Sequence, residues 1–331
     1  MMFWIYSKNL VKLAVAYTRG RSFWNYRLYK KYQDHQNNHG ALKLASTGRF
    51  AIVMQGPLIV DSNFTVETLK LYRHNFPDAI LIFSTWFVPD DIVKLLEKYA
   101  VHIIQNAMPE NHGISNVNLQ IVTSRAGVLA ARDLEAQQVL KTRTDQRIYH
   151  PSLETYLFNL VKTFPLAEGL PIQINRLVGI SLGTFKYRLY GVTDMFLYGH
   201  IDDMLRYWNI PLDTRRDTTE ERKNAGHTLR QFSMWRVCEV YFCTEFLKSI
   251  GRDIAYTLAD SFQVLKNHFV IIDQAAIKLY WHKYTLNEER YAGFGFFDPE
   301  LSFNDWLVLY HSLETITIDE NILDQTVSIC N

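Results

Sequence analysis

The 331-residue chain has a net charge of +1 and a hydrophobic fraction of 48%. That fraction excludes a disordered chain, and the near-zero charge gives no global attraction to nucleic acid. No apolar run approaches the ~18 residues of a membrane span, and the opening six residues are too short for a signal-peptide core. The cysteines, Cys238, Cys243 and Cys330, form no CxxC pair and are typical of reduced core thiols. We expect a soluble, cytoplasmic protein with no nucleic-acid partner.

The N-terminal segment differs from the rest in composition. Residues 1–33 contain no Asp or Glu, and their Lys and Arg residues alternate with aromatic ones. This pattern fits a helix lying on the anionic inner face of the cytoplasmic membrane, where each basic residue contributes about 1 kcal/mol. It equally fits a helix that packs its aromatic side chains on the main domain. Residues 34–40 are polar and predict a linker, so we divide the chain into 1–40 and 41–331.

Strand-like and helix-like runs alternate from residue 50 onwards. Strands are predicted at residues 50–54, 79–83, 100–104 and 139–144, with helices at 65–75, 89–98 and 116–137 between them. The alternation predicts an α/β fold, a mostly parallel sheet flanked by helices. Such sheets bind ligands beyond the carboxyl ends of their strands.

The residues that follow these strands are polar. Gln55-Gly56, Ser84-Thr85, Gln105-Asn106 and Asp145-Gln146-Arg147 follow the four strands in turn. Turn chemistry explains any one of these loops, whereas all four at one edge indicate a shared site.

Two patterns favour a phosphorylated ligand at that edge. Lys141, Arg143 and Asp145 alternate along the fourth strand and therefore point to one side. They serve a ligand if the strand is central, or face water if it is an edge strand. Asn116 and Gln120 begin a stripe of small and polar residues on the preceding helix, which is either a contact surface for a nucleotide sugar or a solvent face.

The second half of the chain supplies candidates on the acceptor side. Strands are predicted at 179–185 and 193–198, a solvated loop or mobile flap at 215–223, and a helix, apolar nearly all round, at 229–250. Glu239 lies within that helix. Burial would raise its pKa and suit it to accept a proton from a sugar hydroxyl, and pairing with Arg236 is the structural alternative.

Several blocks, in this order, resemble one known family. AIVMQGPL (51–58), LYRHNFPDAILIFSTW (71–86), NVNLQIVTSRAGVLAAR (116–132), VLKTRTDQRIY (139–149), GVTDMFLYGHIDDMLRYW (191–208) and FNDWLVLY (303–310) look like the WavE family of lipopolysaccharide synthesis proteins. The resemblance implies a GT-A-like glycosyltransferase domain, with a donor half at about 50–150 and an acceptor half at about 170–310.

The resemblance also implies roles for individual residues. Such enzymes hold a divalent metal with an Asp-x-Asp motif after the fourth strand. Here Asp145 is the one matching acid, and Arg147 replaces the second, so Mg²⁺ or Mn²⁺ would be optional and Arg143 or Arg147 could neutralise the leaving phosphate. Asp194 falls where contacts to the donor sugar or acceptor are expected, or it simply ends a turn. The predicted donor-binding set is Gln55, Gly56, Ser84, Asn116, Gln120, Arg143, Asp145 and Arg147, and the predicted catalytic residues are Glu239 and Asp194.

The sequence therefore predicts a glycosyltransferase that moves a sugar from a nucleotide-sugar donor to a bacterial surface glycan, in lipopolysaccharide core or capsule. The acceptor would be a glycan or a lipid-linked glycan. The alternative is a subunit that binds a nucleotide sugar or glycan without turnover. A dinucleotide oxidoreductase is disfavoured, because no GxGxxG follows an early strand.

Overall fold

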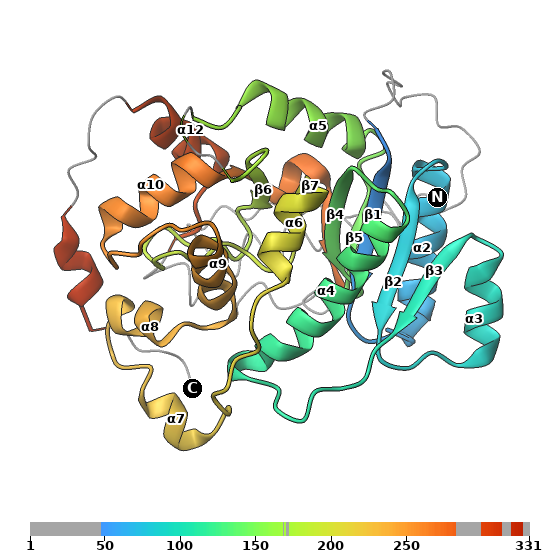
Figure 1. Cartoon of the computed structure of the whole chain (residues 1–331), viewed down its shortest axis with the longest axis horizontal. Coiled ribbons are helices and arrows are strands. Elements are labelled where there is room, and N and C mark those ends of the chain that lie inside the picture. The colour runs from blue at the N-terminus through green and yellow to red at the C-terminus, as the bar shows by residue number, and fades with distance from the viewer. Residues whose placement is uncertain (1–47, 168, 170–171, 283–298, 313–318, 327–331) are drawn as a thin grey trace, which may run out of the picture. The chain divides into compact units, whose positions relative to one another are not determined.

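The computed structural model (Figure 1) describes residues 48–167, 169, 172–282, 299–312 and 319–326. All of them belong to one unit, residues 38–331. The predicted basic segment and linker, residues 1–40, and Cys330 lie outside the described residues. Cys238 and Cys243 are free, buried thiols, as predicted. Within the described ranges, no helix combines the length and the apolar character that a membrane crossing requires.

The first half of the chain forms the predicted strand–helix alternation. Its elements are β1 (Phe50–Gln55), α2 (Phe64–Asn75), β2 (Ile80–Thr85), α3 (Asp90–Glu97), β3 (Val101–Gln105), α4 (Val117–Asp133) and β4 (Gln138–Arg143). Short 3-10 turns, η1 (Asp61–Asn63) and η2 (Ile114–Asn116), precede α2 and α4. The apolar runs predict β1, β2 and β4 well because these strands are buried, β1 and β2 along their whole length.

The central sheet has the strand order β3-β2-β1-β4-β7-β6-β8. Its second half comprises β6 (Leu177–Ile180), β7 (Leu197–His200) and β8 (Phe269–Ile272). Among these described strands β7 runs antiparallel to both neighbours, β4 and β6, while the remaining pairs are parallel. The predicted mostly parallel sheet is confirmed, and β4 is a central strand rather than an edge strand.

The strand order reverses between β1 and β4. The chain moves outwards from β1 to β2 and β3, and then returns through α4 to the other side of β1. The carboxyl ends of β1 and β4 therefore flank a topological switch point, where open α/β sheets form their ligand crevice.

Helices cover both faces of the sheet. On one face α4 lies on β1 and contacts α6 (Ile201–Trp208). A Cβ added to Gly127 of α4 would lie 2.3 Å from Cγ1 of Val53, so the helix approaches the strand closely. The alternate residue Phe50 points to the other face, where its ring lies 6.3 Å from that of Phe76, just after α2.

The strands predicted in the second half are displaced. We expected 179–185 and 193–198, but the strands are Leu177–Ile180 and Leu197–His200. Residues 181–185 leave the sheet through Gly183, whose φ of +82° places it in the left-handed region. Thr184 Oγ1 then accepts a hydrogen bond from the amide of Thr193 (3.1 Å). The β-rich composition therefore belongs partly to two buried loops.

The single helix predicted at 229–250 is wrong. The chain forms α8 (Leu229–Trp235) and α9 (Cys238–Ser249), separated at Arg236, whose φ is +62°. A left-handed residue cannot continue a right-handed helix. Glu239 consequently lies in the first turn of α9 rather than in the middle of an apolar helix.

The remaining elements complete the fold. They are α5 (Leu153–Thr163), α7 (Thr219–Lys223), α10 (Leu258–His268), α12 (Phe303–His311), the short turns η3 (Gln274–Ile277) and η5 (Glu320–Asp324), and a two-stranded antiparallel sheet of β5 (Gln146–Ile148) and β9 (Leu279–Trp281). The run at 215–223 is not a plain solvated loop, because it ends in α7 and the side chain of its first arginine is hydrogen-bonded to Asp213 and to the carbonyls of Trp235 and Arg236.

Candidate donor-binding and catalytic site

A cavity of about 850 Å³ opens at the carboxyl edge of the sheet. This volume suits a drug-sized or nucleotide-sized ligand. All but two of the residues predicted for the site line it: Gln55, Gly56, Asn116, Gln120, Arg143, Asp145, Asp194 and Glu239. The exceptions are Ser84 and Arg147.

The cavity has two walls of different construction. The strand-end wall follows β1 and β4 and consists of Gln55, Gly56, Arg143, Thr144 and Asp145. The loop wall comes from the segment between β6 and β7 and from the start of α9, and consists of Gly183, Phe185, Arg188, Asp194, Met195, Cys238 and Glu239. Ser115, Asn116 and Gln120, at the N-terminal end of α4, also line the cavity.

Arg143 links the two walls electrostatically. Its Nε and Nη2 each donate to a different oxygen of Asp145, at 3.0 Å, and its Nη1 lies 3.7 Å from Oδ2 of Asp194. Burial alone would lower the pKa of the guanidinium, but the two carboxylates outweigh it and raise that pKa. Arg143 is therefore a fixed positive charge on the cavity surface.

Lys141 is fully buried and contacts the backbone of Asp194. The strand register places it beside Val53, on the face that α4 covers, and its ammonium donates to the backbone carbonyl of Asp194. The same ammonium lies 4.7 Å from the centre of the Trp208 ring, a cation–π contact. Burial lowers the pKa of Lys141 to about 7, against an opposing pull from the Asp194 carboxylate. Lys141 does not line the cavity and acts on it through Asp194.

Glu239 reaches the cavity from the first turn of α9. Burial, and then repulsion from Asp194, raise the pKa of its carboxyl, while the Arg188 guanidinium and a bond from the Cys238 thiol (3.1 Å) oppose the rise. The alternative partner Arg236 instead pairs with Glu245, at 2.5 Å. A carboxylate with a raised pKa at a cavity wall is suited to general-base chemistry.

Ser84 and Arg147 lie outside the cavity lining. Ser84 is fully buried next to α4, and its Oγ accepts from the amide of Asn106 (3.0 Å). Arg147 turns towards α2, where its Nε donates to Thr68 Oγ1 (2.8 Å) and its guanidinium stacks on Phe64. Neither is part of the site proposed below.

The surroundings of Asp145 do not fit a divalent cation. Both of its carboxylate oxygens accept from Arg143, and Oδ2 also accepts from the indole of Trp281 (3.0 Å). Mg²⁺ needs carboxylate oxygens that are free to enter an octahedral shell, and the arginine at position 147 supplies none. No cluster of three or more His, Cys, Asp or Glu residues suited to a metal occurs in the part of the chain that the structure describes.

A family model matches residues 50–324, under the description WavE lipopolysaccharide synthesis. The chain belongs to the WavE family. No curated protein gives a significant match. The family match includes every residue of both walls, so the site lies wholly within the part of the chain that defines the family.

Similarity to solved structures is distant. A cytidylyltransferase from Leptospira borgpetersenii matches at 11% identity and a TM-score of 0.29, covering 50% of this chain and 66% of that one. A putative nucleotide-diphospho-sugar transferase from Desulfovibrio desulfuricans matches at 9% and 0.30, covering 47% and 65%. A 4-diphosphocytidyl-2C-methyl-D-erythritol synthase from Anaerococcus prevotii matches at 11% and 0.34, covering 63% and 86%. The WavE-family chain thus spans just under two thirds of the first two, and scores this low carry no functional information.

The structure adds lining residues that the sequence analysis missed. Arg188, Asp217, Arg222, Trp281 and His282 all line the cavity. Trp281 binds Asp145 across 136 residues of chain, and no local pattern could have indicated that contact. A Ser-Asn pair in the left-handed region precedes both α2 (Ser62-Asn63) and α4 (Ser115-Asn116), and the second pair lines the cavity.

Proposed function

We propose that this WavE-family protein is a GT-A-like glycosyltransferase that moves a sugar from a nucleotide-sugar donor to a bacterial surface glycan. The family's description favours lipopolysaccharide as the product, and capsule is the second product class that the sequence allows. The observation that carries the proposal is that Arg143 and Glu239, a fixed positive charge and a buried carboxyl group, line one cavity at the switch point of the sheet.

In this proposal the strand-end wall binds the donor. Arg143 faces the phosphate next to the sugar and stabilises the negative charge that develops as the nucleotide leaves. Asn116 and Gln120 offer amide groups to the donor from the N-terminal end of α4, where a helix favours negative charge. Because Arg143 supplies positive charge at this point, the proposal needs no divalent metal at Asp145.

The loop wall activates the acceptor. A hydroxyl oxygen of the acceptor attacks the anomeric carbon, the bond from that carbon to the phosphate oxygen breaks, and the nucleotide leaves with the bonding electrons. The hydroxyl proton passes to Glu239, or to Asp194 as the second candidate. The raised pKa of Glu239 makes it a stronger base for this role than an exposed carboxylate.

A second function is a binding subunit without turnover. Position 147 favours it, because the residue that replaces the expected second acid is an arginine turned towards α2. One experiment separates the two functions: UDP-, GDP-, ADP- and CMP-sugars are screened by thermal shift with and without Mn²⁺, and stabilising donors are then tested for hydrolysis without acceptor. Donor-dependent stabilisation with hydrolysis supports the transferase, stabilisation without hydrolysis supports the binding subunit, and no stabilisation contradicts the transferase and any subunit that binds a nucleotide sugar.

Peripheral attachment to the inner face of the cytoplasmic membrane is part of the proposal. It rests on the acid-free, aromatic composition of residues 1–33. Deleting these residues should release the protein from anionic vesicles in a co-sedimentation assay while donor hydrolysis continues. Aggregation of the shortened protein would instead indicate that the segment belongs to the core.

A further inference from the structure

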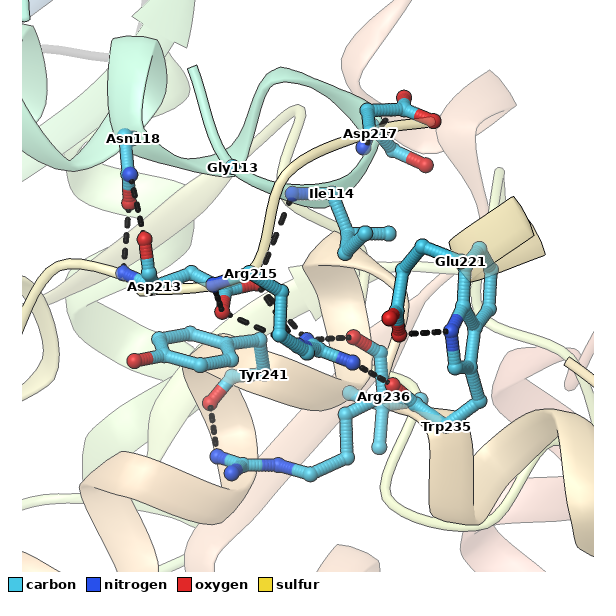
Figure 2. Close-up of polar contacts among 12 residues, drawn as sticks. Gly113, Ile114, Asn118, Asp213, Arg215, Asp217, Glu221, Trp235, Arg236 and Tyr241 are labelled. Atoms are coloured by element: carbon cyan, nitrogen blue, oxygen red, sulfur yellow. Dashed lines mark hydrogen bonds and ion pairs between the residues drawn. The ribbon is translucent and has the colours of Figure 1, made fainter. Parts of the chain in front are cut away.

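Arg215 lies between two parts of the cavity lining that are far apart in sequence. Its Nε and Nη2 donate to the buried carboxylate of Asp213, at 3.0 and 2.7 Å, and Asp213 is in turn bonded to α4. Its Nη1 and Nη2 also donate to the carbonyls of Trp235 and Arg236, just before α9, the second at 3.0 Å. Figure 2 shows the guanidinium reaching from the Asp213 loop to this turn.

Asp213 is fixed to α4 independently of Arg215. Its amide donates to Oδ1 of Asn118 (2.7 Å), and the Asn118 amide group donates to its carbonyl (2.8 Å), as Figure 2 shows. Ile114, at the start of η2, donates its amide to the carboxylate (3.5 Å). Ser115 and Asn116, the next residues, line the cavity. The donor side therefore keeps its anchor if Arg215 is changed.

On the other side, Arg215 holds two carbonyls of the turn before α9. Arg236 adopts φ +62° and ψ +72°, a conformation that costs free energy in a residue other than glycine. Its side chain is held by Thr244 Oγ1 (2.9 Å) and by Glu245 (2.5 Å), and its carbonyl is held by Arg215. Glu239 follows three residues later, so the direction of this turn determines where the carboxylate enters the cavity.

We propose that Arg215 is a positioning residue that fixes the separation between the donor-binding N-terminus of α4 and the base Glu239. The inference rests on the proposed function and extends it to a residue outside the cavity lining. Proton transfer requires hydrogen-bond contact with the acceptor, and a shift of about 1 Å can cost on the order of 10²-fold in rate. Donor binding does not need that separation. Arg215 therefore acts on the rate of transfer and not on donor affinity.

The test replaces the forked guanidinium with a single ammonium. Arg215→Lys keeps the charge beside Asp213 but cannot bond the carboxylate and both carbonyls at once. The matched control is Arg176→Lys, because Arg176 is a buried arginine that also joins two carbonyls, those of Phe164 (2.9 Å) and Lys266 (3.0 Å), away from the cavity. Both variants should melt below the wild type. The probe is the UDP-, GDP-, ADP- or CMP-sugar that the wild type hydrolyses.

We expect Arg215→Lys to bind that donor within about two-fold of the wild type by calorimetry and to hydrolyse it roughly 10- to 100-fold more slowly in a single turnover. Arg176→Lys should retain both values per folded molecule. Equal hydrolysis rates for the two variants would overturn the inference, and so would a loss of donor binding in Arg215→Lys. If Arg215→Lys does not fold, Asp213→Asn weakens the same contact from the carboxylate side. It must then give the same result, near-normal donor binding with slower hydrolysis. A wild type that binds no donor contradicts the proposed function instead.

Discussion

The two walls of the cavity are held in place by different interactions. In the strand-end wall, backbone bonds between neighbouring strand ends fix the positions, such as Gly56 N to Ser84 O (3.1 Å) and Thr144 N to Gln55 O (3.0 Å). In the loop wall, single side chains hold the backbone, such as Lys141 on the carbonyl of Asp194. Backbone bonds survive most substitutions, whereas a side-chain bond is lost with its residue. We therefore expect the two walls to respond differently to mutation.

The largest effect should come from the loop wall, in Glu239→Gln. The amide keeps the shape of the side chain but cannot accept the acceptor's proton, so the rate of transfer should fall by about 10²–10⁴-fold. Donor binding by the strand-end wall should stay near normal. Melting temperature and single-turnover rate are measured on the same preparation. Glu67→Gln, which changes a surface carboxylate paired with Lys70, is the control. If the Glu239→Gln variant melts earlier but reacts at the normal rate, the role of Glu239 is structural.

The next effect should come from the strand-end wall, in Arg143→Ala. Removing a charge that stabilises the leaving group typically costs about 10²–10³-fold in rate, and here donor affinity should fall as well. Asp145→Ala should also weaken donor binding, because it releases Arg143 from its fixed geometry. Binding is measured by calorimetry on folded protein. Arg147→Lys is the matched control, since Arg147 contacts α2 and not the cavity. Normal donor binding by both Arg143→Ala and Asp145→Ala would contradict the proposed donor site.

Sequence patterns predicted the strand-end side better than the loop side, for a physical reason. Strands such as Phe50–Gln55 are fully buried, so their apolar runs begin and end with the strand itself. The alternation of Lys141 and Arg143 also follows directly from strand geometry.

Loop positions depend on distant contacts that no local pattern contains. The apolar run at 229–250 predicts one helix, and it is the bonds of Arg236 to Thr244, Glu245 and Arg215 that hold the turn there. Trp281 reaches Asp145 through the pairing of β5 with β9, which connects separate parts of the chain. The residues missed on the loop side are those whose neighbours are set by tertiary packing.

A smaller effect, on the free energy of unfolding, is expected when an alanine replaces a tightly packed glycine on either side of the sheet. Gly127→Ala would place a methyl 2.3 Å from Cγ1 of Val53, and a β-branched side chain on a central strand cannot move aside easily. We expect it to lower the free energy of unfolding by about 1–3 kcal/mol, more than the helix propensity of alanine returns. Gly179→Ala, on β6, meets Ile271 and Val192 at 3.3 Å and should cost less. Urea unfolding measures the loss of stability in both variants. Equal losses would contradict the tighter packing inferred at Gly127.

A pH-dependent effect on stability is expected from Lys141, which joins the two sides. Its pKa is about 7 in the folded protein, against 10.5 for an exposed lysine. Between these values the unfolded chain binds more protons, so the contribution of Lys141 to stability rises with pH through this window and is lost as pH falls to about 7. Lys141→Met removes the titrating group while keeping a side chain of similar length. The wild type should therefore gain stability relative to Lys141→Met as pH rises from about 7 to 10, and the difference should level off below about pH 7. Urea unfolding of both proteins across this range is the measurement. Parallel stability curves would mean that Lys141 keeps its proton in the folded protein, and the link between the walls would then be a permanent buried charge.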